Sequence, residues 1–138
     1  MARARSFSLA ASNTYVVDLH SRRYTDFDLL RIARAAGQGY AQPVTAFLVN
    51  VQIIACSAVG VVFGHVRAAN RIGRFADGHY LRTSDIQSVQ KEGRFWVVTT
   101  LHSRYVIASF RRDGGRAGLR DFLTARSKGF FISPESLH

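Results

Sequence analysis

The feature that most constrains the fold is a run of 23 residues, Val44–Val66, that contains no Asp, Glu, Lys or Arg. A helix of this length could cross the roughly 30 Å of a lipid bilayer. However, Asn50 and Gln52 lie near the middle of the run, which is also rich in the β-branched residues Val and Ile. We therefore prefer buried strands over 44–66, and a membrane helix is the alternative.

Two fully buried strands are expected in this run, at about Val44–Ala55 and Val59–Val66, with a break at Ser57–Gly60. The only cysteine, Cys56, lies between them, where a small buried hydrophobe is expected. A lone cysteine cannot form an internal disulfide, so a reducing compartment fits and we expect a cytoplasmic protein.

The clearest local signal is Thr25 followed three residues later by Asp28, which resembles a capping box. It predicts a helix from about Asp26 to Ala36, ended by Gly37 in the left-handed conformation. The apolar residues that cover more than half of this helix are Phe27, Leu29, Leu30, Ile32, Ala33 and Ala36. The pattern leaves Asp28, Arg31 and Ala35 outward, so the helix is interpreted as mostly buried scaffold.

Turn residues in the second half predict an antiparallel β-meander. Asp77-Gly78 would form a hairpin that pairs Phe75 with Tyr80 and Arg74 with Leu81. Glu92-Gly93 would form a second hairpin, with Val89 opposite Trp96. A reversal at His102-Ser103 would set residues 95–101 beside 104–110, with Trp96 opposite Ser109.

Together these signals predict one basic α+β domain over residues 1–138. Its sheet would be an antiparallel β-meander, with two helices at about 26–36 and 116–126 packed on it. Further expected segments are a basic arm at 1–12, a first strand at 13–20, a short strand at 130–132 and a tail at 133–138.

The chain is strongly basic, and its charge is unevenly distributed. The formal net charge is +10, and every basic residue except Lys91 and Lys128 is Arg. Arg suits bidentate binding of phosphate or carboxylate, although a GC-rich genome would also explain its abundance. From residue 67 onward, thirteen basic residues stand against six acidic ones, so an anionic partner would bind the second half.

The third predicted hairpin has two distinguishable faces. One face carries an apolar set that suits the core: Phe95, Val97, Val106, Ala108 and Phe110. The other mixes Arg with aromatic rings through Arg94, Trp96, Tyr105 and Arg111. If open, this second face would be a platform for single-stranded nucleic acid. The alternative is that Trp96, Val98 and Ile107 lie under a helix.

A second basic patch is predicted at the loop that precedes the closing helix. It consists of Arg111, Arg112, Arg116 and Arg120, and it includes the pair Gly114-Gly115 at the helix start. Backbone N–H groups and the helix dipole favour anions at such a start, so this patch is the first choice for a phosphate contact. A solvated helix face is the ordinary alternative.

The sequence offers few signs of an enzyme. It lacks the HExxH, paired CxxC, GxSxG and GxGxxG motifs, and we expect no metal and no cofactor. His102, Arg104 and Tyr105 at a sheet end resemble small microbial ribonucleases, which implies a metal-independent ribonuclease as one alternative. No clear general base lies on a neighbouring strand, so a non-enzyme is preferred.

We therefore expect a small binding protein that contacts nucleic-acid phosphates, of RNA or DNA, through its Arg-rich and aromatic surfaces. The residues expected to carry this function are Arg94, Trp96, Tyr105, Arg111, Arg112, Arg116 and Arg120. The alternative from another class is a protein-protein interaction module: an inhibitor or accessory subunit of an assembly, such as one derived from a mobile element. Such a module would form a homodimer or bind an acidic protein.

Overall fold

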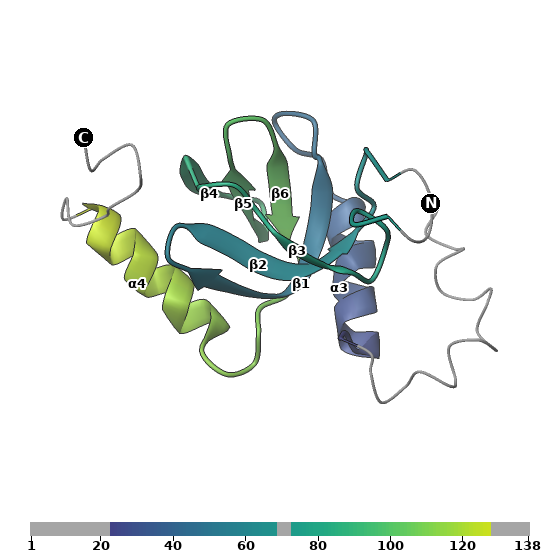
Figure 1. Cartoon of the computed structure of the whole chain (residues 1–138), viewed down its shortest axis with the longest axis horizontal. Coiled ribbons are helices and arrows are strands. Elements are labelled where there is room, and N and C mark those ends of the chain that lie inside the picture. Colours follow the sequence, from purple (N-terminus) through teal and green to yellow (C-terminus); the bar gives the residue numbers. More distant parts are fainter. Residues whose placement is uncertain (1–22, 69–72, 128–138) are drawn as a thin grey trace.

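The computed structural model describes residues 23–68 and 73–127, which form two helices and a six-stranded sheet (Figure 1). The elements are α3 (Asp26–Ala36), β1 (Ala46–Ile54), β2 (Ser57–Phe63), β3 (Tyr80–Arg82), β4 (Ser88–Glu92), β5 (Phe95–Thr99), β6 (Arg104–Ile107) and α4 (Gly115–Ser127). The strand order is β3-β2-β1-β6-β5-β4. The segments expected at 1–12, 13–20, 130–132 and 133–138 lie outside the described residues.

The uncharged run folds as the antiparallel hairpin of β1 and β2, which confirms the preference for strands. Its reversal lies at Ala55 and Cys56, where Ala55 has φ 55°, and not at Ser57–Gly60 as expected. Cys56 is buried, and its thiol donates to Asp85 Oδ1 at 3.3 Å. None of the helices within residues 23–68 and 73–127 is both long and apolar enough to cross a membrane.

A bulge interrupts the β1–β2 ladder in the middle of the run. Val49 pairs with Val61 but Gln52 pairs with Val59, so two residues of β1 face Gly60 alone. The first of them, Asn50, adopts φ 55°. A Cβ at Gly60 would lie 2.8 Å from both Val49 O and Val51 Cγ2, so the bulge requires glycine there.

The sheet is mixed, so the predicted antiparallel meander is wrong although the α+β class is confirmed. β1 pairs in parallel with β6, which places Ala46 beside Tyr105 and Leu48 beside Ile107. The physical reason lies in β1 itself: a strand that is apolar on both faces belongs in the interior of a sheet, with a neighbour on each side. The chain reaches this arrangement by crossing from β3 at one edge to β4 at the other.

The three predicted turns differ in outcome. Asp77-Gly78 does not close a hairpin between Phe75 and Tyr80, because Tyr80 begins β3 and pairs with Val61 of β2. The other two reversals exist, but each is centred one residue away from its predicted position. Trp96 therefore lies opposite Lys91 in β4 and opposite Ile107 in β6, not opposite Val89 and Ser109.

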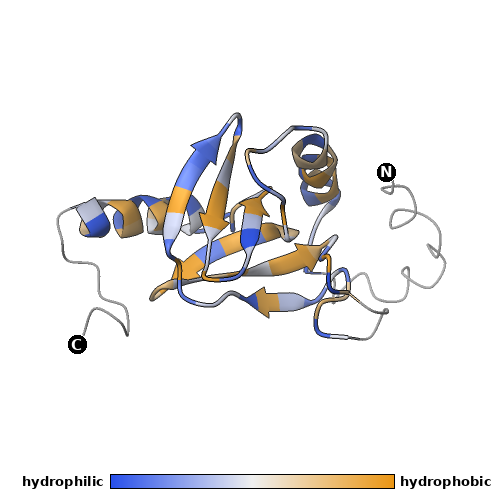
Figure 2. Ribbon diagram, turned by 90° about the horizontal axis from the view of Figure 1, so that it is seen from above, coloured by the Kyte–Doolittle hydropathy of each residue, from blue (hydrophilic) through white to orange (hydrophobic). Residues whose placement is uncertain are grey.

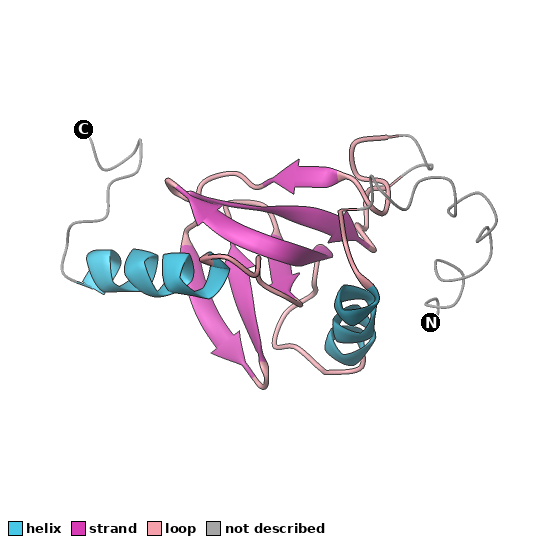
Figure 3. Cartoon of the chain, turned by 90° about the horizontal axis from the view of Figure 1, so that it is seen from below, coloured by secondary structure: helices cyan, strands magenta, loops and turns pink. Residues whose placement is uncertain are grey.

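Apolar side chains fill both faces of the sheet, and Figure 2 shows hydrophobic residues concentrated along its strands. On one face, Ile32 and Ala35 of α3 pack in a cluster with Val97 and Val106. On the other, Phe122 of α4 packs in a cluster with residues that include Ile107. Figure 3 shows the two helices at opposite ends of the sheet.

The predicted bounds of α3 and its capping box are confirmed, but its orientation is not as expected. The buried residues are Asp28, Ile32 and Ala35, whereas Phe27 is 63% exposed and Leu30 49% exposed. Asp28 can be buried because its carboxylate accepts hydrogen bonds from Thr25 N and from Ser109 Oγ. Gly37 has φ −80°, so the expected left-handed end is also wrong.

Candidate functional site

Two neighbouring cavities, of about 440 and 320 Å³, form a basic groove beside the start of α4. They share the lining residues Arg31, Phe110 and Arg116. We name as the cationic groove the surface formed by the six basic residues that line these cavities: Arg31, Lys91, Arg94, Arg111, Arg112 and Arg116. No Asp or Glu of residues 23–68 and 73–127 is among the residues that line either cavity.

The six basic residues come from distant parts of the sequence. Arg31 lies on α3, Lys91 on β4 and Arg94 in the turn before β5. Arg111 and Arg112 follow β6, and Arg116 lies in the first turn of α4. The fold therefore gathers a charge density that no local stretch of the sequence contains.

Gly115 allows α4 to begin close to the sheet. A Cβ at this position would lie 2.6 Å from Val51 O and 3.0 Å from the Cβ of Phe110. The backbone amide of Arg111 also donates a hydrogen bond to Val51 O, at 2.9 Å. These contacts fix Arg111 and the helix start, and therefore Arg116, relative to β1.

Arg31 is the most constrained cation of the groove. Its Nε donates to the carbonyl oxygen of Ala108 at 2.8 Å, and its Cζ lies 4.8 Å from the centroid of the Phe95 ring. Within the described part of the chain, no acceptor is bound to its two Nη groups. The side chain is thus anchored at Nε, which leaves the Nη groups available to a ligand.

Burial lowers the pKa of Arg31, and the neighbouring charges of Arg116, Arg34 and Arg94 lower it further. These are like charges in proximity, and no carboxylate in the described part of the chain lines the cavities to compensate them. The carboxylate of Asp28 lies behind the groove, where it accepts from Ser109 Oγ at 2.6 Å and from Thr25 N. The groove is therefore a site of accumulated positive potential.

Aromatic rings accompany these cations. The Cζ of Arg116 lies 4.7 Å from the centroid of Phe110, and Lys91 Nζ lies 5.8 Å from that of Trp96. Phe27 also lines the larger cavity and is largely exposed. The groove thus presents at least one ring that a flat ligand could reach.

Most of the residues that the sequence singled out lie at this groove. Arg94, Arg111, Arg112, Arg116 and Trp96 line it. Arg120 lies beside it, at a smaller cavity of about 180 Å³ that Trp96, Leu119 and Leu123 also line.

Tyr105 lies elsewhere, since it is only 5% exposed and belongs to the core. Ile107 and Val98 on the same face are also buried, and Phe122 and Leu123 of α4 pack in the same cluster. The hypothesis of an open aromatic sheet face is therefore wrong for Tyr105, Val98 and Ile107, which are buried, whereas Trp96 is only partly buried and lines the groove.

Arg31 and Phe27 are groove residues that the sequence did not indicate. The apolar pattern of α3 placed Arg31 toward solvent and Phe27 in the core. The residue that could have indicated their positions is Asp28. Its carboxylate accepts a hydrogen bond from Ser109 after β6, so the face of α3 that carries Asp28 points inward. Arg31 is one turn later and lies on the same side of α3, next to the groove.

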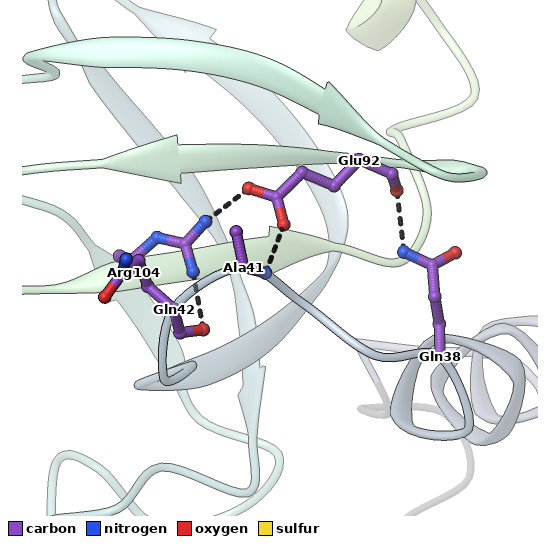
Figure 4. Close-up of polar contacts among 5 residues, drawn as sticks. All are labelled: Gln38, Ala41, Gln42, Glu92 and Arg104. Carbon is purple, nitrogen blue, oxygen red and sulfur yellow. Dashed lines mark hydrogen bonds and ion pairs between the residues drawn. The ribbon is translucent and has the colours of Figure 1, made fainter.

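The three residues of the ribonuclease alternative do not surround one cavity. Arg104 donates to Glu92 Oε2 at 2.5 Å and to Gln42 O at 2.6 Å (Figure 4). Glu92 also accepts from Ala41 N at 3.0 Å, so this network ties the loop after α3 to β4 and β6. His102 and Tyr105 line a different cavity, to which Arg104 does not contribute.

Among residues 23–68 and 73–127, no group of three or more His, Cys, Asp or Glu side chains could hold a metal ion. Comparisons with protein-family models, with curated proteins and with solved structures found no significant match.

Proposed function

We propose that this protein binds nucleic acid and that the cationic groove contacts the backbone phosphates. The observation that carries the proposal is the convergence of six basic residues on a groove that no carboxylate of the described residues lines. The cations also repel one another: after burial, the charges of Arg116, Arg34 and Arg94 are the further causes that lower the pKa of Arg31. A polyanion would relieve this repulsion.

The shape of the groove favours a chain of phosphates over one small anion. Its two cavities adjoin through Arg31 and Arg116, so a ligand can extend from Arg111 and Arg112 to Lys91 and Arg94. Arg side chains bind phosphate oxygens in a bidentate manner, which suits contacts at successive phosphates. The exposed ring of Phe27 at one end favours a single strand, whose bases are free to stack.

The test is a fluorescence-anisotropy titration of labelled oligonucleotides, single-stranded and duplex, at about 50 and 200 mM salt. If all six cations contact phosphates of a single strand, the logarithm of the binding constant should fall with the logarithm of salt concentration with a slope of about −4. Flat or undetectable binding at the lower salt would overturn the proposal.

A double variant, Arg94→Ser with Arg116→Ser, examines the groove itself. Both side chains are exposed, so the fold should survive. The salt slope should become shallower by about 1.5, since two phosphate contacts are lost. Arg34→Ser is the matched control because Arg34 is exposed but lines neither cavity of the groove. An equal change of the salt slope in the double variant and in Arg34→Ser would show a nonspecific effect of charge.

The exposed pair Phe27 and Leu30 supports the second candidate function, a protein-binding module. The two residues lie three positions apart and thus on one side of α3. Light scattering at low and high salt separates the candidates: a dimer that persists at high salt indicates apolar association. A monomer at both salt concentrations leaves nucleic-acid binding as the favoured function.

A further inference from the structure

A second cationic cavity lies at the far end of the β5–β6 hairpin. It has a volume of about 290 Å³, and we call it the loop cavity because His102 and Ser103 of the β5–β6 turn contribute to it. Arg94 of the cationic groove precedes β5, whereas the loop cavity begins at Thr100, after this five-residue strand. At about 3.3 Å per residue, Arg94 and Thr100 are separated by roughly 20 Å along the strand.

Three arginines line the loop cavity: Arg67, Arg74 and Arg82. Within the described residues, no Asp or Glu lines this cavity and none of the three arginines forms an ion pair. Arg67 is held in place, because its Nη2 donates to Ser103 Oγ at 3.1 Å and its amide donates to His65 Nδ1 at 3.0 Å. The cavity is therefore a preformed site for an anion.

Aromatic rings lie beside these arginines. The Phe75 ring stacks on the buried His65 ring with centroids 4.0 Å apart, and the Cζ of Arg74 lies 4.7 Å from the Phe75 centroid. Tyr80 is 53% exposed and lies on β3 two residues before Arg82, with buried Leu81 between them. A ring and a guanidinium thus project from the same face of one strand.

We propose that the loop cavity binds a nucleotide, with the phosphate among Arg67, Arg74 and Arg82 and the base stacked on Tyr80. A bare anion would need only the arginines, whereas the exposed Tyr80 ring beside them suits a planar base as well, on the side opposite Arg23, whose Cζ lies 4.5 Å from the ring centroid. The volume is near the lower end of the range of about 300 to 1,000 Å³ that small-molecule sites occupy, which suits one nucleotide. This site is independent of the cationic groove.

The nucleotide can be free or can be the 5′-phosphorylated end of a strand, because both present the same chemistry. The test uses adenosine 5′-monophosphate, adenosine, inorganic phosphate and a short oligonucleotide with and without a 5′-phosphate. Affinities are measured by calorimetry, and amide chemical shifts map the site. We expect shifts at Ser84, Thr100 and Ser103, and none at Gly114 and Ala117 of the groove. Adenosine and phosphate should each bind about tenfold more weakly than the nucleotide.

Two variants separate the phosphate contacts from the base contact. Arg74→Ser with Arg82→Ser should weaken nucleotide binding by about tenfold or more, since two charged contacts are lost. Tyr80→Ala should weaken nucleotide binding but leave phosphate binding unchanged. All three side chains are exposed, so these variants should fold. The matched controls are Arg34→Ser and the groove variant Arg94→Ser with Arg116→Ser, both of which should bind the nucleotide normally.

The two sources give different results in the strand arm. A higher affinity for the 5′-phosphorylated oligonucleotide than for adenosine 5′-monophosphate would identify a strand end as the ligand. Equal affinities for the two would identify a free nucleotide. Shifts confined to the groove, phosphate that binds as tightly as the nucleotide, or full affinity in the Arg74 and Arg82 variant would each overturn the proposal. If the groove variant alone departed from its prediction and kept the salt slope of the original protein, the result would concern the proposed function and not this site.

Discussion

Ser109 donates a hydrogen bond from its Oγ to Asp28 Oδ1 at 2.6 Å, across 81 positions of the sequence. The same Oγ accepts from the amide of Asn50 at the β1 bulge, at 2.9 Å. Asp28 at the same time accepts from Thr25 N at 2.8 Å in the capping box. One buried serine thus joins the start of α3, the bulge of β1 and the segment after β6, which sets the orientation of Arg31 one turn later.

Replacing Ser109 with Ala should destabilise the fold by about 2 to 3 kcal/mol, because a buried carboxylate oxygen and the Asn50 amide both lose their partner. Urea denaturation measures the change. Ser84→Ala is the control, since Ser84 is exposed, and its effect should stay within about 0.5 kcal/mol. A loss at Ser109 as small as that of the control would show that α3 is held by apolar contacts alone.

The bulge provides a second stability prediction. Gly60→Ala should cost about 3 kcal/mol, because the new methyl group would lie 2.8 Å from Val49 O, a backbone atom that cannot easily move away. Gly39→Ala is the matched control, since nothing lies within 4 Å of its Cβ position. There we expect a stabilisation of up to about 1 kcal/mol through a less flexible unfolded chain. Similar melting temperatures for the two variants would contradict the tight packing at the bulge.

Local chemistry in the sequence was sufficient to predict several elements. Thr25 and Asp28 gave the start of α3, the uncharged run gave the β1–β2 hairpin, and Leu119 and Phe122 gave the buried side of α4. The faces of β5 and β6 were also correct although their turn was misplaced. A turn displaced by one residue moves each pairing by two positions, and side chains alternate with a period of two, so each face keeps its residues.

The parallel pairing of β1 with β6 could not be predicted from the sequence, because turn residues indicate pairing only between strands that are consecutive in the chain. For a similar reason, only part of the cationic groove could be predicted from the sequence. Arg111, Arg112 and Arg116 form a local cluster, whereas Arg31 joins them only through the long-range bond between Asp28 and Ser109. Hydropathy placed Phe27 inside the protein and Arg31 outside, and this buried polar contact reverses both positions.

Stability should depend on pH through His65. Burial lowers its pKa below the ordinary value of 6.5, and the charges of Arg67 and Arg74 lower it further. The folded protein therefore keeps this imidazole neutral, while the unfolded chain takes up a proton near 6.5. Stability should be full above that pH and fall as the pH decreases from there toward the folded-state pKa, by at most about 1.4 kcal/mol per pH unit.

Urea denaturation at several pH values between about 7.5 and 5.5 measures this dependence. His65→Phe keeps a ring against Phe75 but cannot titrate, so its stability should vary less over the same range. A variant with the same pH profile as the original protein would assign the dependence to other groups.

Phe27 should contribute to binding and not to folding, because it is largely exposed and lines the groove. Phe27→Ala should weaken single-stranded oligonucleotide binding by about 1 to 3 kcal/mol through lost stacking. Duplex binding should be nearly unchanged, since paired bases are not free to stack on the ring. Leu30→Ala, on the same exposed side of α3 but outside the groove lining, is the control. Equal losses for single strands and duplexes would argue against a stacking role.

Arg31 should show opposite effects on folding and on binding. Burial disfavours its charge, and the charges of Arg116, Arg34 and Arg94 oppose it further, so Arg31→Met should leave the free energy of unfolding unchanged or raise it at low salt. The methionine keeps an apolar stem over Phe95 but cannot contact a phosphate. Oligonucleotide affinity should therefore fall, and the salt slope should become shallower by about 1.

The combination of these two measurements distinguishes a ligand-binding cation from a structural one. If Arg31 served mainly to hold α3 on the sheet through Ala108 O, its replacement would lower stability and leave the salt slope unchanged. A groove that binds a polyanion predicts the reverse, because the repulsion among Arg31, Arg94 and Arg116 should destabilise the free protein and decrease when phosphates bind. Added salt should likewise stabilise the original protein more than the Arg31→Met variant, since mobile anions screen the same repulsion.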